Sequence, residues 1–241
     1  MDIATEIPQP TEIPEVEAQD PYVLSPAEES ELLADHPWPR FAVLGDSIAR
    51  GMGDPAEGYL TAAWGGRVAA ALARERDGVT YVNLAQHGAK AADIRDSQLA
   101  PALDLEPDLV AVIGGGNDLL AEEFDIAPVK SALDDIVVAL TDAGATVVTY
   151  ETVDFPRAFP DPAFEEFNRR LLDLYAATRE IARERGTVHV DIYREPWAAE
   201  RYLFSADLQH PTMRAQALAA SATVRALGEH LRARGTTSRG E

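Results

Sequence analysis

Residues 109–118 read LVAVIGGGND, five apolar residues followed by three glycines, an asparagine and an aspartate. A short apolar run that ends at a glycine turn is typical of a strand buried on both faces of a parallel sheet. Similar runs recur along the chain, and longer stretches with helical periodicity separate them. The other runs lie at residues 41–44, 81–84, 146–150 and 188–192, and the helical stretches at 64–76, 91–103, 128–143, 163–185 and 212–234.

Strand and helix therefore alternate five times. This alternation predicts an α/β protein in which a five-stranded parallel sheet lies between two helical layers, with right-handed crossovers. The sequence does not contain the strand order, and 2-1-3-4-5 is a usual arrangement for such a doubly wound sheet. We therefore expect a three-layer α/β/α sandwich.

The first 39 residues differ in composition from the rest of the chain. They contain ten acidic residues, no lysine or arginine, and many prolines. Such a segment buries too little apolar surface to offset its ordering entropy. We expect residues 1–39 to form a flexible, solubilising tail with a short helix at 26–34 capped by Ser25; a docking or lid segment is the alternative. The folded domain is predicted at residues 40–235, followed by a disordered C-terminus at 236–241.

Charge and composition argue against several classes of function. The net charge of −20 comes from 41 acidic and 21 basic residues, without a basic stripe that could neutralise phosphates, so nucleic acid is not an expected partner. No run approaches the roughly 18 apolar residues of a membrane span, and the first residues lack a secretory signal, so a cytoplasmic location is predicted. The chain has no cysteine, and its five histidines lack metal-binding spacing, so no metal site is expected.

Residues with catalytic potential follow four of the predicted strands. Ser47 follows the first strand, within Gly45-Asp46-Ser47, Gly88 follows the second and Asn117 the third, while His210 lies beyond the fifth. Ligands of open α/β sheets bind outside the carboxyl ends of the strands. We therefore expect these four loops to meet at one edge of the sheet.

Ser47 and His210 form a candidate nucleophile and base. A serine hydroxyl attacks poorly until a neutral imidazole accepts its proton. Asp207 lies three residues before His210, and this spacing lets its carboxylate accept a hydrogen bond from one ring nitrogen and leave the other nitrogen for the serine. Alone, the first motif would be a helix cap and the second a surface turn. Together they predict acyl transfer chemistry.

The loops also offer donors for an oxyanion. The Gly88 backbone N–H can approach closely because glycine has no side chain, Asn117 offers a side-chain amide, and the Ser47 N–H is a third donor. His87 is a rival base without an obvious carboxylate partner, and we interpret it as a pocket-wall residue. His189 is interpreted as a structural histidine.

These motifs resemble the four conserved blocks of the SGNH (GDSL-type) hydrolases, an esterase and lipase family, and the likeness runs from about residue 41 to about residue 231. The matching blocks are Gly45-Asp46-Ser47, residues 83–88, residues 115–118 and residues 207–211. The resemblance implies a flavodoxin-like fold and hydrolysis of esters or thioesters without a cofactor. By matching position, Ser47 would be the nucleophile, Asp207 and His210 the rest of the triad, and Ser47, Gly88 and Asn117 the oxyanion donors. Two departures are Ile48, where the family has leucine, and residues 212–216, where relatives often have a glycine at the helix start.

The loops at residues 52–64, 152–162 and 193–205 are expected to set specificity. The last two are rich in aromatic residues and suit an acyl chain or an aromatic ester, although simple loop packing explains them equally well. The predicted substrate contacts are Asp46, His87, Phe155 and Trp197. We expect a small-molecule ester as substrate, and the sequence leaves the oligomeric state open. An acyltransferase that uses the same triad and a non-catalytic ligand-binding domain are the alternatives.

Overall fold

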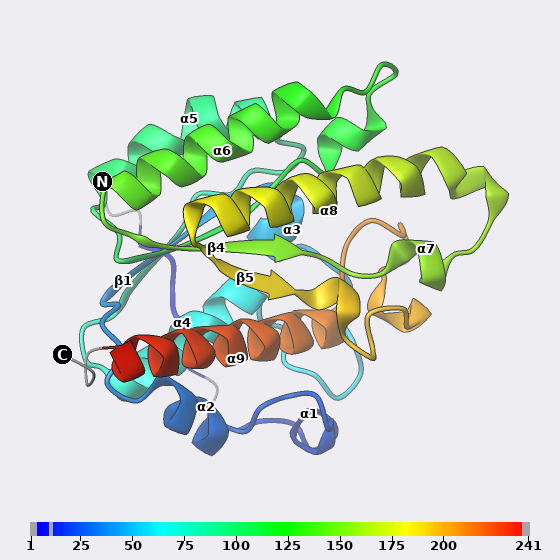
Figure 1. The fold of residues 1–241 in the computed structure, drawn as a ribbon. Helices are drawn as coiled ribbons and strands as arrows, with labels where there is room; N and C mark the ends of the chain where they lie inside the picture. Colours follow the sequence, from blue (N-terminus) through cyan, green and yellow to red (C-terminus); the bar gives the residue numbers. More distant parts are fainter. Residues whose placement is uncertain (1–3, 10–11, 238–241) are drawn as a thin grey trace.

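The computed structural model describes residues 4–9 and 12–237 and contains a five-stranded parallel sheet (Figure 1). The strand order is β2-β1-β3-β4-β5, which confirms the predicted sheet and its order. The strands are β1 (Arg40–Gly45), β2 (Thr80–Asn83), β3 (Leu109–Ile113), β4 (Thr146–Glu151) and β5 (Val188–Asp191).

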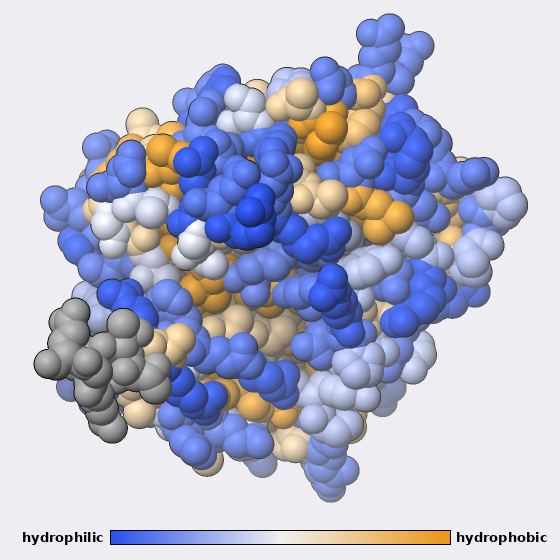
Figure 2. Space-filling view, in the orientation of Figure 1, coloured by the Kyte–Doolittle hydropathy of each residue, from blue (hydrophilic) through white to orange (hydrophobic). Residues whose placement is uncertain are grey.

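Helices cover both faces of the sheet, as predicted for a three-layer sandwich (Figure 1). On one face lie α5 (Ala91–Asp104), α6 (Ile126–Asp142) and α8 (Glu165–Arg185), and on the other lie α4 (Trp64–Glu75) and α9 (Met213–Thr237). Along the described residues, no helix combines the length and apolarity needed to cross a bilayer. The face seen in Figure 2 is largely hydrophilic, with small apolar areas scattered across it.

The apolar strands divide the core in two, because successive side chains of a strand point to opposite faces. In β1, Phe41 and Val43 join the core under α4 and α9, whereas Ala42 and Leu44 join the core under α5, α6 and α8. The chain leaves β1 toward α4 on one face and leaves β3 toward α6 on the other face. The loops after β1 and β3 therefore diverge at a switch point, which is where open α/β sheets hold their ligands.

The N-terminal segment differs from the expected flexible tail. Its described part contains α1 (Glu15–Gln19) and α2 (Pro26–Leu33), and α2 packs against α9 and α4 (Figure 1). The predicted short helix is confirmed, with the Ser25 side chain accepting a hydrogen bond from the Glu28 N–H. Leu33 and Trp38 are fully buried in the core. The segment is held because it supplies this apolar surface and pairs its acids with arginines of the domain.

The acid–arginine pairs link α1 and the residues after it to distant parts of the chain. Glu17 is 2% exposed and lies 2.6 Å from Arg67 of α4, and Asp20 lies 2.8 Å from Arg214 of α9. At the other end, α9 extends to Thr237. The rest of the segment expected to be a disordered C-terminus, residues 238–241, lies outside the described residues, as do residues 1–3 and 10–11 of the expected tail.

Candidate active site

The turn after β1 places Ser47 at the start of a short helix, α3 (Ser47–Arg50). Gly45 is required in this turn, because a β-carbon there would lie 1.9 Å from the Ile113 carbonyl oxygen of β3. Asp46 caps α3 by accepting a hydrogen bond from the Ile48 N–H at 2.9 Å. Ser47 thereby becomes the first helical residue, with 7% of its surface exposed.

The glycine loop after β3 positions Asn117. Gly115 has φ +92°, a conformation that side chains rarely adopt, and a β-carbon there would meet Leu174 at 2.7 Å. The Asn117 amide nitrogen donates to the Ala89 carbonyl oxygen at 3.0 Å and lies 3.5 Å from the Asp46 carboxylate. Asn117 therefore joins the loops that follow β1, β2 and β3.

Asp46 is almost fully buried, and burial raises its pKa to about 6. Its carboxylate serves the helix cap with one oxygen, while the other oxygen faces the Asn117 amide. Asp46 was predicted as a substrate contact, and it does line the cavity next to Ser47. Its hydrogen bonds, however, are directed into the protein.

Two backbone donors beside these loops are unoccupied. Gly88 is exposed, has φ +76° and has open space beside its α-carbon. Within the described part of the chain, neither the Gly88 N–H nor the Ser47 N–H donates a hydrogen bond. Free N–H groups at a turn and at the start of a helix are suited to hold an anionic oxygen.

Asp207 and His210 lie in one turn and are directly bonded. The Asp207 carboxylate accepts from His210 Nδ1 at 2.6 Å and from the backbone N–H groups of His210 and Gln209 at 3.0 and 2.9 Å. The His210 N–H is the main cause that lowers the pKa of Asp207 to about 2, followed by the bond to the ring. Leu208 completes the turn with φ +59°. The carboxylate therefore stays ionised and fixes the ring orientation of His210.

Ser47, Asn117, Asp207 and His210 line one cavity of about 400 Å³. Four loops that are far apart in sequence thus meet at the carboxyl edge of the sheet. Within the described residues, Ser47 Oγ and the His210 ring are not hydrogen-bonded to each other, although both face this cavity. Phe155, a predicted substrate contact, also lines it.

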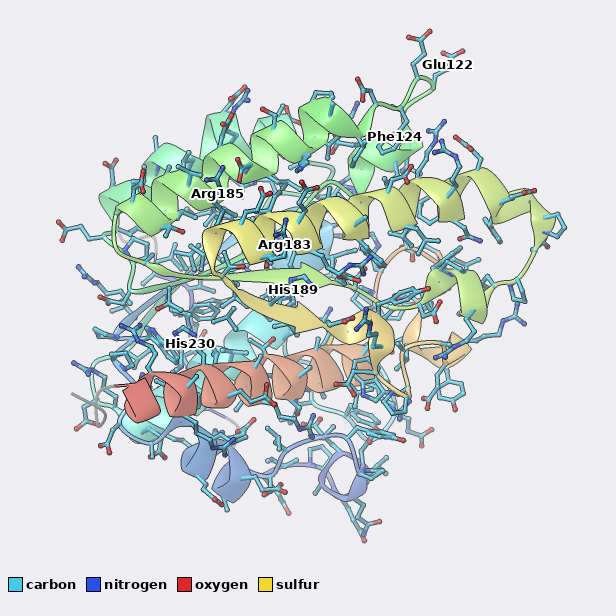
Figure 3. The ribbon with its side chains drawn as sticks, in the orientation of Figure 1. Glu122, Phe124, Arg183, Arg185, His189 and His230 are labelled. Atoms are coloured by element: carbon cyan, nitrogen blue, oxygen red, sulfur yellow. The ribbon has the colours of Figure 1, made fainter. Side chains whose placement is uncertain are left out.

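Three other residues considered from the sequence lie outside the cavity wall. His87 is exposed, and its ring centroid lies 5.9 Å from that of His210. Trp197, a predicted substrate contact, is instead 1% exposed and lines a separate cavity of about 60 Å³, because it packs into the core under α9. His189 on β5 (Figure 3) is bonded at Nδ1 to Thr149 and at Nε2 to Glu151, each at 3.0 Å, as a structural histidine would be.

The sequence analysis missed the inner wall of the cavity. The apolar stripe on α8, which includes Leu171, Leu174 and Ile181, lines the cavity, although such a stripe on a helix is more often core packing. No sequence signal separates the two cases, because an apolar stripe has the same spacing whether it packs or encloses a void. Among the described residues, no group of three or more His, Cys, Asp or Glu is arranged to hold a metal ion.

The comparison with protein families now identifies the class. A model of the GDSL-like lipase/acylhydrolase family matches residues 43–218, from β1 into α9. The chain belongs to this family, as the resemblance implied, and it is a carboxylic ester hydrolase. A search of the curated proteins found no match.

Solved structures of similar fold include a lipase/acylhydrolase from Enterococcus faecalis, with 19% identity and a TM-score of 0.63 over 79% of this chain and 96% of that chain. A catalytic mutant of an acetylxylan esterase from Geobacillus stearothermophilus has 18% identity and a TM-score of 0.63, covering 78% and 94% of the two chains. A psychrotrophic esterase from Pseudoalteromonas sp. has 17% identity and a TM-score of 0.61, covering 80% and 98%. At these identities the similarity concerns the fold.

Proposed function

We propose that the protein hydrolyses small carboxylic esters through a covalent acyl-enzyme on Ser47, with His210 as general base and acid and Asp207 as the group that orients His210. The observation that carries the proposal is the shared cavity, which is lined by both Ser47 and His210. The Nδ1 atom of His210 is already hydrogen-bonded to the ionised carboxylate of Asp207. The second ring nitrogen, Nε2, is then left to accept the serine proton. The cytoplasmic location stays a prediction.

The reaction has two halves. Ser47 Oγ attacks the acyl carbonyl while His210 Nε2 takes its proton, and collapse of the tetrahedral intermediate expels the alcohol, which receives that proton from His210. A water molecule then attacks the acyl-serine with His210 as base, and the acid is released as Ser47 recovers its proton. The Ser47–His210 hydrogen bond forms once substrate fills the cavity, since such bonds tighten in the bound complex.

The negative charge of the tetrahedral intermediate is assigned to three donors. The N–H groups of Ser47 and Gly88 are free of other partners in the described residues. The Asn117 amide donates one hydrogen to the Ala89 carbonyl, and its second hydrogen, whose bond to the Asp46 carboxylate is long at 3.5 Å, is shared with the oxyanion. Donors held in place before the reaction stabilise the transition state without reorganisation.

The test is hydrolysis of p-nitrophenyl acetate by the wild type and by Ser47→Ala, with Ser131→Ala as the matched control. Ser131 is exposed on α6 and does not line the cavity. We expect Ser131→Ala to match the wild type, and Ser47→Ala to lose about 10³-fold or more of kcat, since the nucleophile is gone. Equal turnover by Ser47→Ala and the wild type would remove Ser47 from the mechanism.

A further inference from the structure

The cavity at Ser47 continues well beyond the catalytic residues. Its wall includes Phe167 near the start of α8 and Ile181 near its end, about 14 residue steps or roughly 20 Å along the helix. Leu133 and Val137 of α6 form the opposite side, and Val112 of β3 and Thr149 of β4 form the floor. The cavity therefore runs from the carboxyl edge of the sheet inward, between α6, α8 and the strands.

Among the described residues, the hydroxyl groups of the inner wall are already hydrogen-bonded within the protein. The Thr149 hydroxyl is bonded to Thr187 and His189, the Tyr175 hydroxyl to Thr152 and the Val153 carbonyl, and the Thr178 hydroxyl to the Leu174 carbonyl. The ionisable groups Asp46, Asp207 and His210 are confined to the end at Ser47. A sugar or a charged group would lose its hydration inside without replacement. An apolar chain would lose nothing.

A cavity of this size next to an apolar core indicates a binding site for a ligand. Protein interiors hold few voids larger than a water molecule, and this cavity measures about 400 Å³. A methylene group is close in size to a water molecule, whose share of liquid volume is about 30 Å³. The whole cavity, its end at Ser47 included, therefore has room for at most about a dozen methylene groups.

Part of the outer rim is apolar as well. Leu120, in the loop after β3, is 62% exposed, and Leu208, between Asp207 and His210, is 39% exposed. Both line the cavity mouth together with Phe155 and Phe204, whose rings lie edge to face. His87 and Gly88, by contrast, are exposed and do not line the cavity, although the His87 ring centroid lies 5.9 Å from that of His210. The two sides of a bound ester thus meet different surroundings, one apolar and enclosed, the other open to water.

We propose that this cavity is an acyl channel, and that the enzyme acts on esters of unbranched medium-chain acids of about 8 to 12 carbons, with the alcohol on the solvent side. This inference rests on the proposed function, because the carbonyl must lie at Ser47 for the chain to enter the channel. Each methylene that enters the channel leaves water for an apolar wall, which sets the expected direction of the chain-length dependence.

The test is kcat/KM for p-nitrophenyl esters from acetate to hexadecanoate. We expect the wild type to prefer the octanoate to dodecanoate esters over the acetate by at least about 10-fold. Thr178→Phe places a ring in the channel, and it should lower kcat/KM for the octanoate to dodecanoate esters to the value for the acetate ester. Val137→Phe, from the α6 wall, should do the same. The matched control is Leu172→Phe, which adds a ring on the solvent side of α8, where Leu172 is 42% exposed. It should keep the wild-type profile.

A binding measurement separates this inference from the catalytic proposal. Ser47→Ala should bind decanoate but not acetate in calorimetry, and adding Thr178→Phe should abolish the decanoate signal. The channel would be overturned if the wild-type kcat/KM did not change with chain length. It would also be overturned if Thr178→Phe and Val137→Phe lowered kcat/KM equally for the acetate and decanoate esters. In either case, acetate hydrolysis that depends on Ser47 would still support the proposed mechanism. Decanoate binding that both ring substitutions leave unchanged would also overturn it.

Discussion

At the scale of single residues, Asp46 links the architecture of the site to its chemistry. It caps the helix that begins with Ser47, and it faces the amide of Asn117. A carboxylate with 2% exposure loses most of its hydration, which is why its pKa rises to about 6. The site therefore contains a buried acid that titrates just below neutral pH, separate from Asp207, whose pKa is lowered.

The raised pKa of Asp46 makes stability depend on pH. Between pH 4 and pH 6 the folded protein binds the Asp46 proton more tightly than the unfolded chain, whose carboxyl has a pKa near 3.8. The free energy of unfolding therefore falls as pH rises through this window. Asp46→Asn keeps a capping side chain and removes the titration. The free energy of unfolding of Asp46→Asn minus that of the wild type should therefore rise by on the order of 2 kcal/mol from pH 4 to pH 7. Urea unfolding at each pH measures both proteins. A stability difference that stays constant across this range would contradict the assignment.

Asn117 is the donor whose loss should affect the chemical step and little else. Asn117→Ala should lower kcat for acetate ester hydrolysis by about 10²–10³-fold with KM nearly unchanged, because the bond to the oxyanion exists only in the transition state. Steady-state kinetics measures both constants. A rise in KM at constant kcat would instead show that Asn117 binds the ester in its ground state.

At the scale of elements, the acidic N-terminal segment acts as a clamp on the loop between α3 and α4. Glu17 accepts from Arg67 and from the Leu60 N–H, and Asp20 accepts from the Tyr59 hydroxyl at 2.7 Å. Arg214 of α9 joins the same network through Asp20 and Glu200. The loop at residues 52–64, expected to help set specificity, is thereby fixed from outside.

The contribution of this clamp to stability can be tested at one residue pair, Glu17 and Arg67, which two hydrogen bonds join. Glu17→Gln leaves Arg67 partly buried without its counter-charge, and we expect a loss of about 3–5 kcal/mol in the free energy of unfolding. Glu15→Gln on the same helix is the control, because Glu15 is exposed, and its effect should stay within about 0.5 kcal/mol. Urea unfolding measures both variants. If Glu17→Gln unfolds at the wild-type midpoint, the segment is not held by this pair.

The elements also show which features a sequence can predict. The strands and the loop residues after them were predictable, because an apolar run followed by Gly-Asp-Ser or Gly-Gly-Asn forms a strand and a turn through residues that are neighbours in the sequence. The N-terminal packing was not, because acidic and proline-rich composition is also typical of disorder, and the partners Arg67 and Arg214 lie far along the chain. Trp197 was misplaced for a related reason, since an aromatic residue in a loop can face the site or the core.

At the scale of the whole molecule, the sheet separates two cores of different character. The core under α4 and α9 carries the N-terminal helices, and the core under α6 and α8 contains the long cavity. The loops that carry the proposed triad lie where these halves meet, at the carboxyl edge of the strands (Figure 1). In the proposed mechanism the strands hold the reacting groups, and in the proposed channel the helix side chains shape the space for the acyl chain. Chemistry and specificity can thus be changed separately.

The central claim is that Ser47 is the nucleophile activated by His210. It is tested most directly by reacting the protein with a fluorophosphonate and mapping the adduct by peptide mass spectrometry. We expect one phosphonyl group, on the peptide that contains Ser47, no labelling of Ser47→Ala, and labelling of His210→Ala slowed by about 10³-fold or more. An adduct on another residue, or labelling of Ser47 at an unchanged rate in His210→Ala, would contradict the account.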